Sequence, residues 1–230
     1  MRVTPEQVAR AKAVAERCGA PFVERRGAIE AVLAGHSLAY VVARDREWVT
    51  DGREQVRVEA GLLHAKIAAG AAHPLIRAVG PAAHVIDCTL GLAGDALHLS
   101  AVLGARVDAS EASPVVYSLV EAGLSAPDPR WAEAAARIHA HRCAAIDLLR
   151  STRADVVFLA PMFETPARAA PGYGLFRAIA DHRELDPGTL DAARSAAPRV
   201  VVRVEKGAPA PEPGWHSLPG KAVDYWVWSR

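Results

Sequence analysis

Strand-like and helix-like segments alternate through the last two thirds of the chain, and this order constrains the fold more than any other feature. Strands are predicted in AHVIDC, ARVDAS, RIHAHRC, ADVVFLA and RVVVRVE. The segments between them have helical spacing, as where Leu92, Ala96 and Leu99 fall on one face. Strands joined by helices imply right-handed crossovers and a mostly parallel sheet covered on both faces. The sequence therefore predicts a doubly wound α/β domain over residues 81–230.

The two ends of the chain depart from this alternation. The segment WHSLPGKAVDYWVWSR predicts two strands that form a terminal antiparallel hairpin. At the other end, Thr4 caps a helix that has Pro5 at its first position and Gln7 closing a capping box. The strand-like runs LAYVVAR, WVTDG and QVRVE follow, and then a helical stretch that breaks between Gly70 and Pro74. We expect residues 1–80 to form a small α+β appendage or lid.

Composition excludes several classes of protein. A hydrophobic content of 51% with 23% charged residues is a globular balance and not a disordered one. A net charge of +1 gives no overall basic field that would attract nucleic acid. The three cysteines are far apart, so they predict neither a disulfide framework nor a zinc site. An H-x-H pair, His139 and His141, has no Cys or carboxylate partner nearby in the sequence, and we expect no metal.

Nothing in the sequence indicates a membrane protein. The N-terminal segment MRVTPEQVARAK is polar and helical, unlike a signal peptide. Lys66 interrupts the most apolar run before it reaches membrane-spanning length. We therefore expect a cytoplasmic protein without a membrane partner, and the sequence leaves its oligomeric state open.

The loops that follow the strands carry a candidate ligand site. Doubly wound sheets bind ligands outside the carboxyl ends of their strands, near the point where the strand order reverses. The first strand ends at Asp87 and leads into a turn with Gly91 and Gly94, where a ligand can approach backbone and helix N-terminus. Glu111 ends the second strand at the spacing of an acid that binds ribose hydroxyls, and Asp147 follows a later strand. This order favours a ligand that contains adenosine.

Three motifs make the interpretation specific. The turn lacks the GxGxxG of NAD sites, because Thr89 stands where the first glycine would be. The stretches IDCTLGLAGDAL, SEASPVV and DVVFLAPMF resemble the bacterial family of small-subunit ribosomal RNA guanine-N2 methyltransferases. In that family they run approximately as DATxGLGxDA, ERSPV and DVVYLDPMFP. The similarity covers most of the chain, including EAGLLHAKIAAG and AVDYWVW. It implies a class I methyltransferase fold (a Rossmann-like sheet) that uses S-adenosylmethionine (SAM).

The resemblance also implies roles for individual residues. Asp87 would hold the amino-acid end of SAM, above a backbone turn made by two glycines. Glu111 would hold the ribose and Asp147 the adenine side. Thr89 and Asp95 would lie near the carboxylate end, and helix N-capping is an equally good interpretation of both. The SAM-binding residues implied in this way are Asp87, Thr89, Gly91, Gly94, Asp95, Glu111, Ala112 and Asp147.

The sequence departs from the family where the acceptor should bind. Ala160 replaces an acid that, in amine-methylating members of this fold, accepts a hydrogen bond from the target amine. The backbone carbonyls of Ala160 and Pro161 are acceptors that remain. The loop ETPARAAPGYG carries only Arg168, and HAKIAAG keeps His64 and Lys66 without further positive charge. Because RNA binding depends on several phosphate contacts, this thinning disfavours an rRNA acceptor.

Several functions remain open at this point. The chain could methylate a small molecule, or it could act on SAM itself by closing the methionine chain into azetidine-2-carboxylate and releasing methylthioadenosine. The alternatives are N-methylation of rRNA guanine or of a small-molecule acceptor, and SAM or RNA binding without catalysis. A cyclase would need a deprotonated amine, an anchored carboxylate and a site closed to water.

The candidate catalytic residues lie around the same strand end. Tyr173, in APGYG, is predicted to cover the pocket and to face the sulfonium by cation–π attraction. Met162 and Phe163 follow the strand of Ala160 and are predicted to line the cavity. His64 is a candidate base from the N-terminal segment. Ordinary packing is the competing interpretation for each of these side chains.

Overall fold

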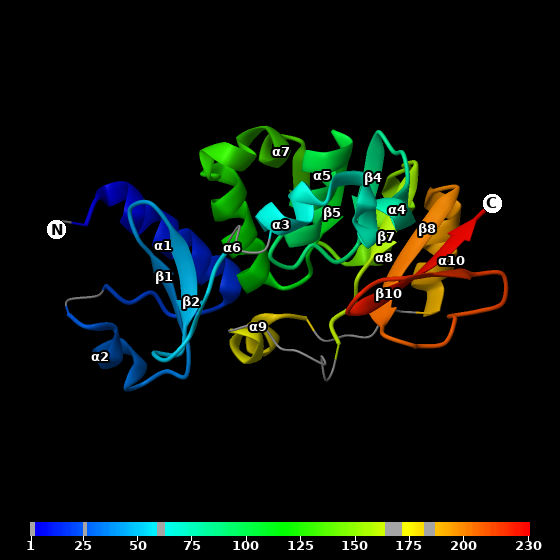
Figure 1. Ribbon diagram of the computed structural model, residues 1–230. Helices are drawn as coiled ribbons and strands as arrows, with labels where there is room; N and C mark the ends of the chain where they lie inside the picture. Colours follow the sequence, from blue (N-terminus) through cyan, green and yellow to red (C-terminus); the bar gives the residue numbers. More distant parts are fainter. Residues whose placement is uncertain (1–2, 25–26, 59–62, 164–171, 182–186) are drawn as a thin grey trace.

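The computed structural model describes residues 3–24, 27–58, 63–163, 172–181 and 187–230, which form two sheets surrounded by helices (Figure 1). The smaller sheet is antiparallel in the order β1-β2-β3 and lies with α1 and α2 at the N-terminal end of the molecule. We call these five elements the N-terminal module. They are α1 (Pro5–Cys18), α2 (Ile29–Leu33), β1 (Ala39–Val42), β2 (Glu47–Thr50) and β3 (Gln55–Val56).

The larger sheet has seven strands in the order β6-β5-β4-β7-β8-β10-β9, of which the first five are parallel and the last two form the terminal antiparallel hairpin. This confirms the predicted doubly wound sheet. Its elements are β4 (His84–Asp87), α5 (Gly94–Leu103), β5 (Arg106–Ser110), α6 (Pro114–Ser125), η2 (Pro129–Trp131), α7 (Ala132–Ala136), β6 (Ile138–His141), α8 (Ala145–Ser151), β7 (Val156–Leu159), α9 (Tyr173–Ile179), α10 (Pro187–Ala196), β8 (Arg199–Glu205), β9 (His216–Pro219) and β10 (Val223–Ser229).

The chain reverses direction across the sheet between β4 and β7. From β4 it proceeds outward to β5 and β6, and it then returns to place β7 on the other side of β4. The carboxyl ends of these parallel strands lie on the lower side of the sheet in Figure 1, where α9 is also found. A ligand site in this architecture is expected where β4 and β7 end.

Side-chain alternation along the strands divides the core into two layers. Val85, Phe158 and Val201 are buried on the face that packs against α4 (Pro74–Val79) and α5. Ile86 and Val157 are buried on the opposite face, against α8 and α10. Side chains along a strand alternate between its two faces. The residues two positions beyond Val85, Phe158 and Val201 therefore also point toward the α5 face. This rule governs which side chains meet at the strand ends.

Two arginines of α1 connect this helix to its neighbours, one to β2 within the N-terminal module and one to α6 outside it. The predicted capping box at Thr4 is confirmed and fixes the start of this helix. Arg10 donates two hydrogen bonds to the buried carboxylate of Glu47 on β2. Arg17 reaches α6, where it bonds the hydroxyl of Ser118 and forms a 2.6 Å ion pair with Glu121.

The segment between the two sheets also follows the expected pattern of a helix, a break and a second short helix. The three pieces are α3 (Leu63–Ala68), the 3-10 helix η1 (Gly70–Ala72) and α4 (Pro74–Val79). α3 packs against α5, and α4 packs against β8 and β10 of the large sheet. The division of the chain near residue 80 stays a prediction. No helix in the described part of the chain is both long and apolar enough to cross a membrane.

Candidate functional site

The turn that follows β4 joins two strand ends through Thr89. Its backbone N–H donates a 2.9 Å hydrogen bond to the carboxylate of Asp87, and its hydroxyl lies 3.3 Å from the same oxygen. The backbone N–H of Ala160, just beyond β7, donates to that hydroxyl at 2.7 Å. Thr89 is therefore not a helix N-cap. Thr89 connects Asp87 to Ala160, the residue that stands where the family has an acid.

Asp87 is an acid with almost no access to water. Its exposed fraction is 1%. Burial raises the pKa of this carboxyl to about 7, and the hydrogen bond from the backbone of Thr89 offsets only part of that effect. A buried carboxyl that titrates near neutrality at the end of a central strand marks a candidate binding site.

Glu111 holds the glycine turn from the neighbouring strand. Its carboxylate accepts a 3.1 Å hydrogen bond from the backbone N–H of Gly91 and a 2.8 Å bond from that of Ser113. Burial raises the pKa of Glu111 to about 7, although these N–H groups and that of Ala112 oppose the shift. A carboxylate has about four acceptor positions, so hydroxyl groups of a ligand can still bind here.

The two predicted turn glycines differ in backbone conformation. Gly91 has a left-handed backbone, with φ of 51°, but Gly94 is the first residue of α5 and is not left-handed. The second left-handed residue is Ala93, with φ of 60°. Aligned with the pattern DATxGLGxDA, Ala93 stands at a glycine position. A side chain at Gly94 would meet nothing within 4 Å, so open space adjoins the helix N-terminus.

Asp95 lies in the first turn of α5, one residue beyond Gly94. It is not the N-cap, since Ala93 occupies that position without a side-chain bond. Its carboxylate forms ion pairs with Lys66 of α3, at 2.9 Å, and with Arg203 of β8. Burial alone would raise the pKa of Asp95, but Arg203 and Lys66 outweigh it and hold this pKa below its usual range.

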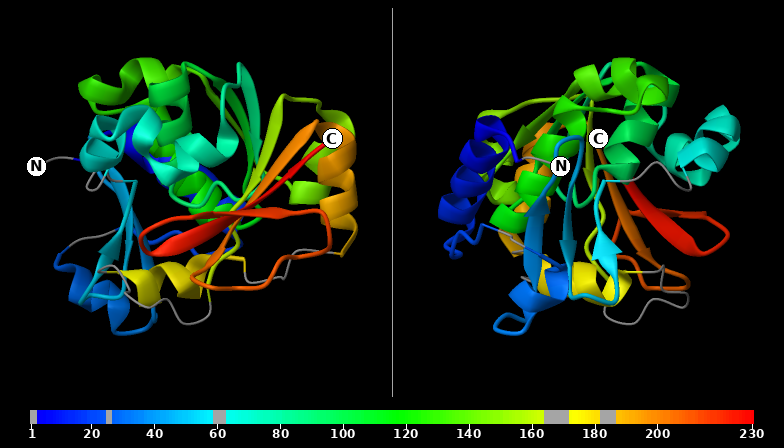
Figure 2. Two further views of the ribbon diagram at one scale, coloured as in Figure 1. Left: turned by 45° about the vertical axis from the view of Figure 1, so that its right-hand side comes forward. Right: turned by 90° about the vertical axis from the view of Figure 1, so that its left-hand side faces the viewer.

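α9 closes the lower edge of the sheet, below the strand ends and beside β3 in both views of Figure 2. The carbonyl of Phe163 accepts hydrogen bonds from the hydroxyl of Tyr173, at 2.6 Å, and from Arg177, at 2.8 Å. A side chain on Gly91 would lie 3.5 Å from the ring of Phe176. α9 therefore covers the glycine turn, with Phe176 as the nearest aromatic residue.

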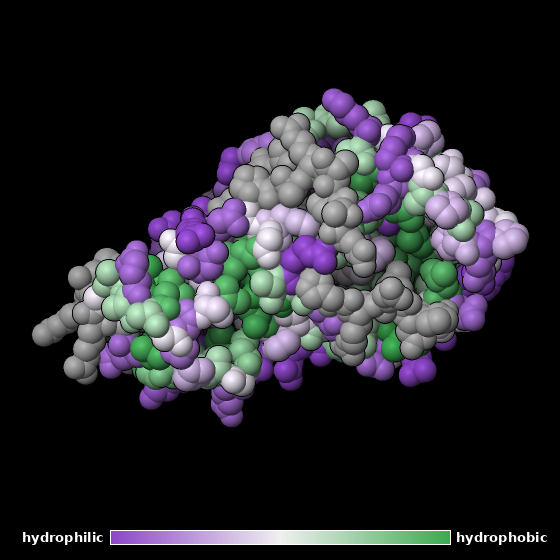
Figure 3. Space-filling model, turned by 90° about the horizontal axis from the view of Figure 1, so that it is seen from below, coloured by the Kyte–Doolittle hydropathy of each residue, from purple (hydrophilic) through white to green (hydrophobic). Residues whose placement is uncertain are grey.

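The side chains predicted to cover or line the cavity, Tyr173, Phe163 and Met162, belong to the segments around this edge. Tyr173 stays at the mouth of the site, but its hydroxyl is engaged by the backbone of Phe163. The ring of Phe163 lies 5.8 Å from the guanidinium carbon of Arg203. Met162 precedes it in the same half-buried stretch. Figure 3 views the molecule from this side and shows hydrophobic surface between hydrophilic patches.

Two predicted site residues point elsewhere. Asp147 lies in the first turn of α8 with its side chain 61% exposed, and the nearest cation is Arg150 at 4.0 Å. His64 lies on α3, where its ring packs edge-on against Trp131 at 4.8 Å and its Nε2 contacts Arg130. Neither contact leads to the glycine turn. Arg168 lies outside the described residues.

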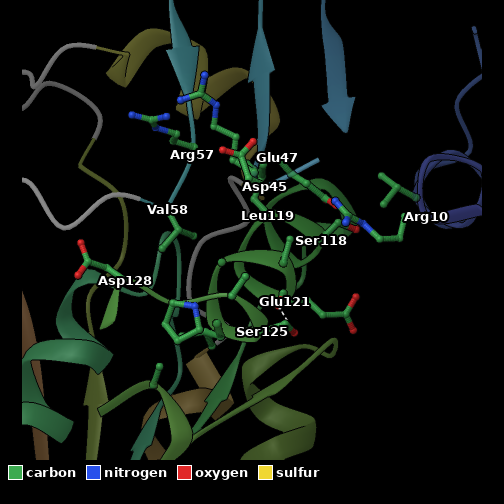
Figure 4. A pocket seen from close by; sticks show the side chains of 18 of the residues that line it. Arg10, Asp45, Glu47, Arg57, Val58, Ser118, Leu119, Glu121, Ser125 and Asp128 are labelled. Carbon is green, nitrogen blue, oxygen red and sulfur yellow. Dashed lines mark hydrogen bonds and ion pairs between the residues drawn. The ribbon is translucent and has the colours of Figure 1, made fainter. Parts of the chain in front are cut away.

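A separate pocket of about 720 Å³ lies between the N-terminal module and α6. Figure 4 shows Arg10 and Arg57 on the side of the module and Ser118 and Glu121 on the side of the helix. Its lining includes Trp131, which contacts His64. The lining of this pocket does not include the turn after β4.

Sequence reasoning missed three cations and one carboxylate. Arg203 and Arg177 contact the strand-end loop, and Lys66 was noted only as remaining charge, although it pairs with Asp95. The signal for Arg203 was its position near the carboxyl end of RVVVRVE. His141 has a carboxylate partner that is distant in the sequence. Asp108 of the adjacent strand accepts its Nε2 at 3.0 Å.

A metal centre finds no support in the described part of the chain, which brings no three His, Cys, Asp or Glu side chains close enough to hold an ion. The buried acids face backbone N–H groups and cations instead. Such a set suits an organic ligand that carries both hydroxyl groups and ionic groups.

Comparison with known proteins shows the family to which this chain belongs. The family model described as "Putative SAM-dependent methyltransferase" matches residues 55–215. The chain belongs to this family. The match begins at β3 and includes the glycine turn, Glu111 and the strand-end loop after β7. SAM is therefore the cofactor of this family member, and the chain is an enzyme of the SAM-dependent transferase class.

The curated relatives have a more specific name. "Ribosomal RNA small subunit methyltransferase J" from Halorhodospira halophila is 37% identical over 172 residues, which is 67% of this chain. The protein of the same name from Rhodopseudomonas palustris strain HaA2 is 34% identical over 193 residues, or 76% of this chain. The chain spans 64% of the length of the first relative, which is slightly less than two thirds, and 88% of the length of the second.

A solved structure confirms the fold. A SAM-dependent methyltransferase from Neisseria gonorrhoeae superposes with a TM-score of 0.68, covering 95% of this chain and 91% of its own. Sequence identity is 22%, so this similarity concerns the fold alone. The predicted class I methyltransferase fold is thereby confirmed.

Proposed function

We propose that this protein is a methyltransferase that transfers the methyl group of SAM to an exocyclic guanine amine of small-subunit ribosomal RNA. One observation carries the proposal. The buried carboxylate of Asp87 and the half-buried carboxylate of Glu111 stand at the ends of adjacent strands, and both accept hydrogen bonds from backbone N–H groups of the loops that follow. The names of the relatives supply small-subunit rRNA as the acceptor. The guanine amine follows from the sequence resemblance, and the reduced number of basic residues counts against RNA.

The residues divide the work between the two ends of the cofactor. When bound, SAM supplies an electrophilic methyl group on its sulfonium. Asp87 accepts a hydrogen bond from the α-ammonium, and Glu111 accepts bonds from the ribose hydroxyls. Gly94 leaves room for the cofactor to lie against the backbone, since a side chain there would meet nothing within 4 Å. α9 covers the turn and restricts access of water to the reacting atoms.

The acceptor amine is positioned without an acid side chain. The backbone carbonyls of Ala160 and Pro161 accept its N–H hydrogen bond and direct its lone pair toward the methyl carbon. Thr89 fixes this stretch, because its hydroxyl binds the Ala160 N–H. After transfer, the amine releases its proton to solvent. A carbonyl orients a nucleophile but does not carry the proton away, so we expect a slow enzyme.

A small-molecule acceptor is the second candidate, and Ala160 is the observation that favours it. An acceptor with a better nucleophile than a guanine amine needs no carboxylate at this position. The comparisons give no support to cyclisation of SAM to azetidine-2-carboxylate and methylthioadenosine. An rRNA acceptor is consistent with the cytoplasmic location expected from the sequence.

The deciding experiment offers one enzyme several acceptors. Purified protein is incubated with SAM alone, with unmodified small-subunit rRNA, with assembled small subunits, and with a metabolite extract, and the nucleoside products are separated by mass spectrometry. We expect S-adenosylhomocysteine and methylated guanosine only when rRNA is present. S-adenosylhomocysteine from the extract alone would favour the small-molecule acceptor. Methylthioadenosine above the spontaneous level, with SAM alone, would overturn methyl transfer.

The substitution Ala160→Asp tests how the amine is held. If the acceptor is an amine, the restored carboxylate should raise kcat by roughly tenfold or more, because general-base and positioning groups contribute on that scale. The control is Ala154→Asp, at the entrance to the same strand and away from the site. A fall in kcat with an unchanged fold would argue that this pocket is shaped for another acceptor.

A further inference from the structure

Three charged side chains from distant parts of the sequence meet above the strand ends. Lys66 comes from α3, Asp95 from the first turn of α5 and Arg203 from β8. We call them the charged triad. Its members are only partly exposed, with side-chain fractions of 32%, 16% and 27% in that order. The family resemblance gave a role to Asp95 alone.

Strand register places the triad next to the candidate site. Phe158 of β7 pairs with Val201 of β8 and with Asp87 of β4. Two residues further along each strand, Ala160 and Arg203 point to that same face of the sheet. The charge of Arg203 also lowers the pKa of Asp87, although burial dominates that shift, so the two groups are within electrostatic range.

The two cations retain unused hydrogen-bond donors. A lysine ammonium has three donors and an arginine guanidinium has five. Asp95 accepts one from Lys66 and one from Arg203. The Nε of Arg203 is buried and has no hydrogen-bond partner among the described residues. Because buried N–H groups in folded proteins are nearly always paired, this nitrogen points to a ligand oxygen.

The net charge of the charged triad indicates which kind of ligand oxygen it would bind. Two cations and one carboxylate leave one net positive charge in a half-buried position, which favours an anionic ligand group. The proposed cofactor carries such a group, since the α-carbon of SAM bears both an ammonium and a carboxylate. The ammonium is assigned to Asp87, and the carboxylate on the same carbon must lie close by.

We propose that Lys66 and Arg203 bind the α-carboxylate of SAM, and that Asp95 holds the two cations in position. The inference rests on the proposed use of SAM but not on the identity of the acceptor. It gives Arg203 a place in the reaction, because an anchored carboxylate fixes the methionine chain and therefore the direction of the methyl group.

The test compares SAM with decarboxylated SAM, which lacks only the α-carboxylate. Dissociation constants for both are measured by isothermal titration calorimetry for the wild type, Arg203→Gln and Lys66→Gln. Lys206→Gln serves as the control, because it removes a cation near the end of the same strand that bonds Asp224 instead. Thermal unfolding of each variant verifies that it is folded.

The expected result is a loss of discrimination. The wild type should bind SAM roughly 10- to 100-fold more tightly than decarboxylated SAM, as removal of a charge-assisted hydrogen-bonding group implies. Arg203→Gln should weaken the binding of SAM alone, which brings the two dissociation constants within about threefold of each other. Lys66→Gln, whose side chain is more exposed, should have a smaller effect in the same direction. Lys206→Gln should match the wild type.

Three outcomes would overturn the inference. The first is a wild type that binds the two compounds equally, and the second is an Arg203→Gln variant that weakens both equally. The third is unchanged SAM binding in folded Arg203→Gln with weakened binding of rRNA, which would assign the cations to phosphate. Failure of rRNA methylation with intact discrimination would instead reject the acceptor and leave the carboxylate site standing.

Discussion

Ala93 carries the one left-handed backbone among the described non-glycine residues. This conformation costs an alanine about 1–2 kcal/mol relative to a right-handed one, whereas glycine adopts it freely. We predict that Ala93→Gly raises the free energy of unfolding by about 1 kcal/mol, measured by urea denaturation. The matched control is Ala101→Gly within α5, which should lower it by about 0.5–1 kcal/mol. Equal losses in both variants would contradict the prediction.

The shifted pKa of Asp87 makes cofactor binding depend on pH. With its pKa raised to about 7 by burial, this group is protonated in the free protein below neutral pH and must lose its proton to pair with an ammonium. SAM affinity should therefore rise up to about tenfold per pH unit toward 7 and level off above it. Titration calorimetry between about pH 5.5 and about pH 8.5 measures the slope.

The variant Asp87→Asn separates this effect from other titrations. It should bind SAM more weakly at pH 8 and show a shallower slope, to which Glu111 still contributes because its pKa is also raised to about 7. A slope identical to that of the wild type would remove Asp87 from the titration. The direction of the effect follows from proton release on binding.

At the scale of single elements, two side chains of α9 donate hydrogen bonds to the carbonyl of Phe163. Tyr173→Phe removes one of the two hydrogen bonds to the carbonyl of Phe163 and leaves the one from Arg177. A neutral hydrogen bond contributes about 1 kcal/mol, so amide exchange within α9 should accelerate roughly fivefold. Hydrogen-exchange mass spectrometry tests this, with Tyr117→Phe as a control whose hydroxyl bonds Glu121 on α6. Unchanged exchange in α9 would show that other contacts hold it.

Strand and helix positions followed from local pattern, because each depends on neighbours in the sequence. The capping residue Thr4 marked the start of α1, and the acids Asp87 and Glu111 fell at the end of β4 and directly after β5 as expected. Arg203 was missed because its partner is 108 residues away, and no local rule connects the two. Side-chain direction in loops, as for Tyr173, likewise depends on contacts made after folding.

At the scale of the whole molecule, the two arginines of α1 differ in burial. Arg10 pairs with Glu47, whose side chain is 5% exposed, whereas Arg17 pairs with Glu121, which is 45% exposed. Arg10→Met should cost about 2 kcal/mol of unfolding free energy, because it removes the cation from a buried carboxylate and leaves it with a hydrogen bond from Tyr40. Arg17→Met should cost about 1 kcal/mol or less. Urea denaturation compares the two, and a larger loss for Arg17→Met would contradict this ranking.

The charged triad has a consequence for how the protein is made. Its members stand at positions 66, 95 and 203, so the third is synthesised long after the first two. Chains emerge from the ribosome at about 5–20 residues per second, and β8 has to insert beside β7 before Arg203 can reach Asp95. A nascent chain that already contains the glycine turn therefore still lacks the third charge. Until β8 is in place, the growing polypeptide should have little affinity for the free cofactor around it.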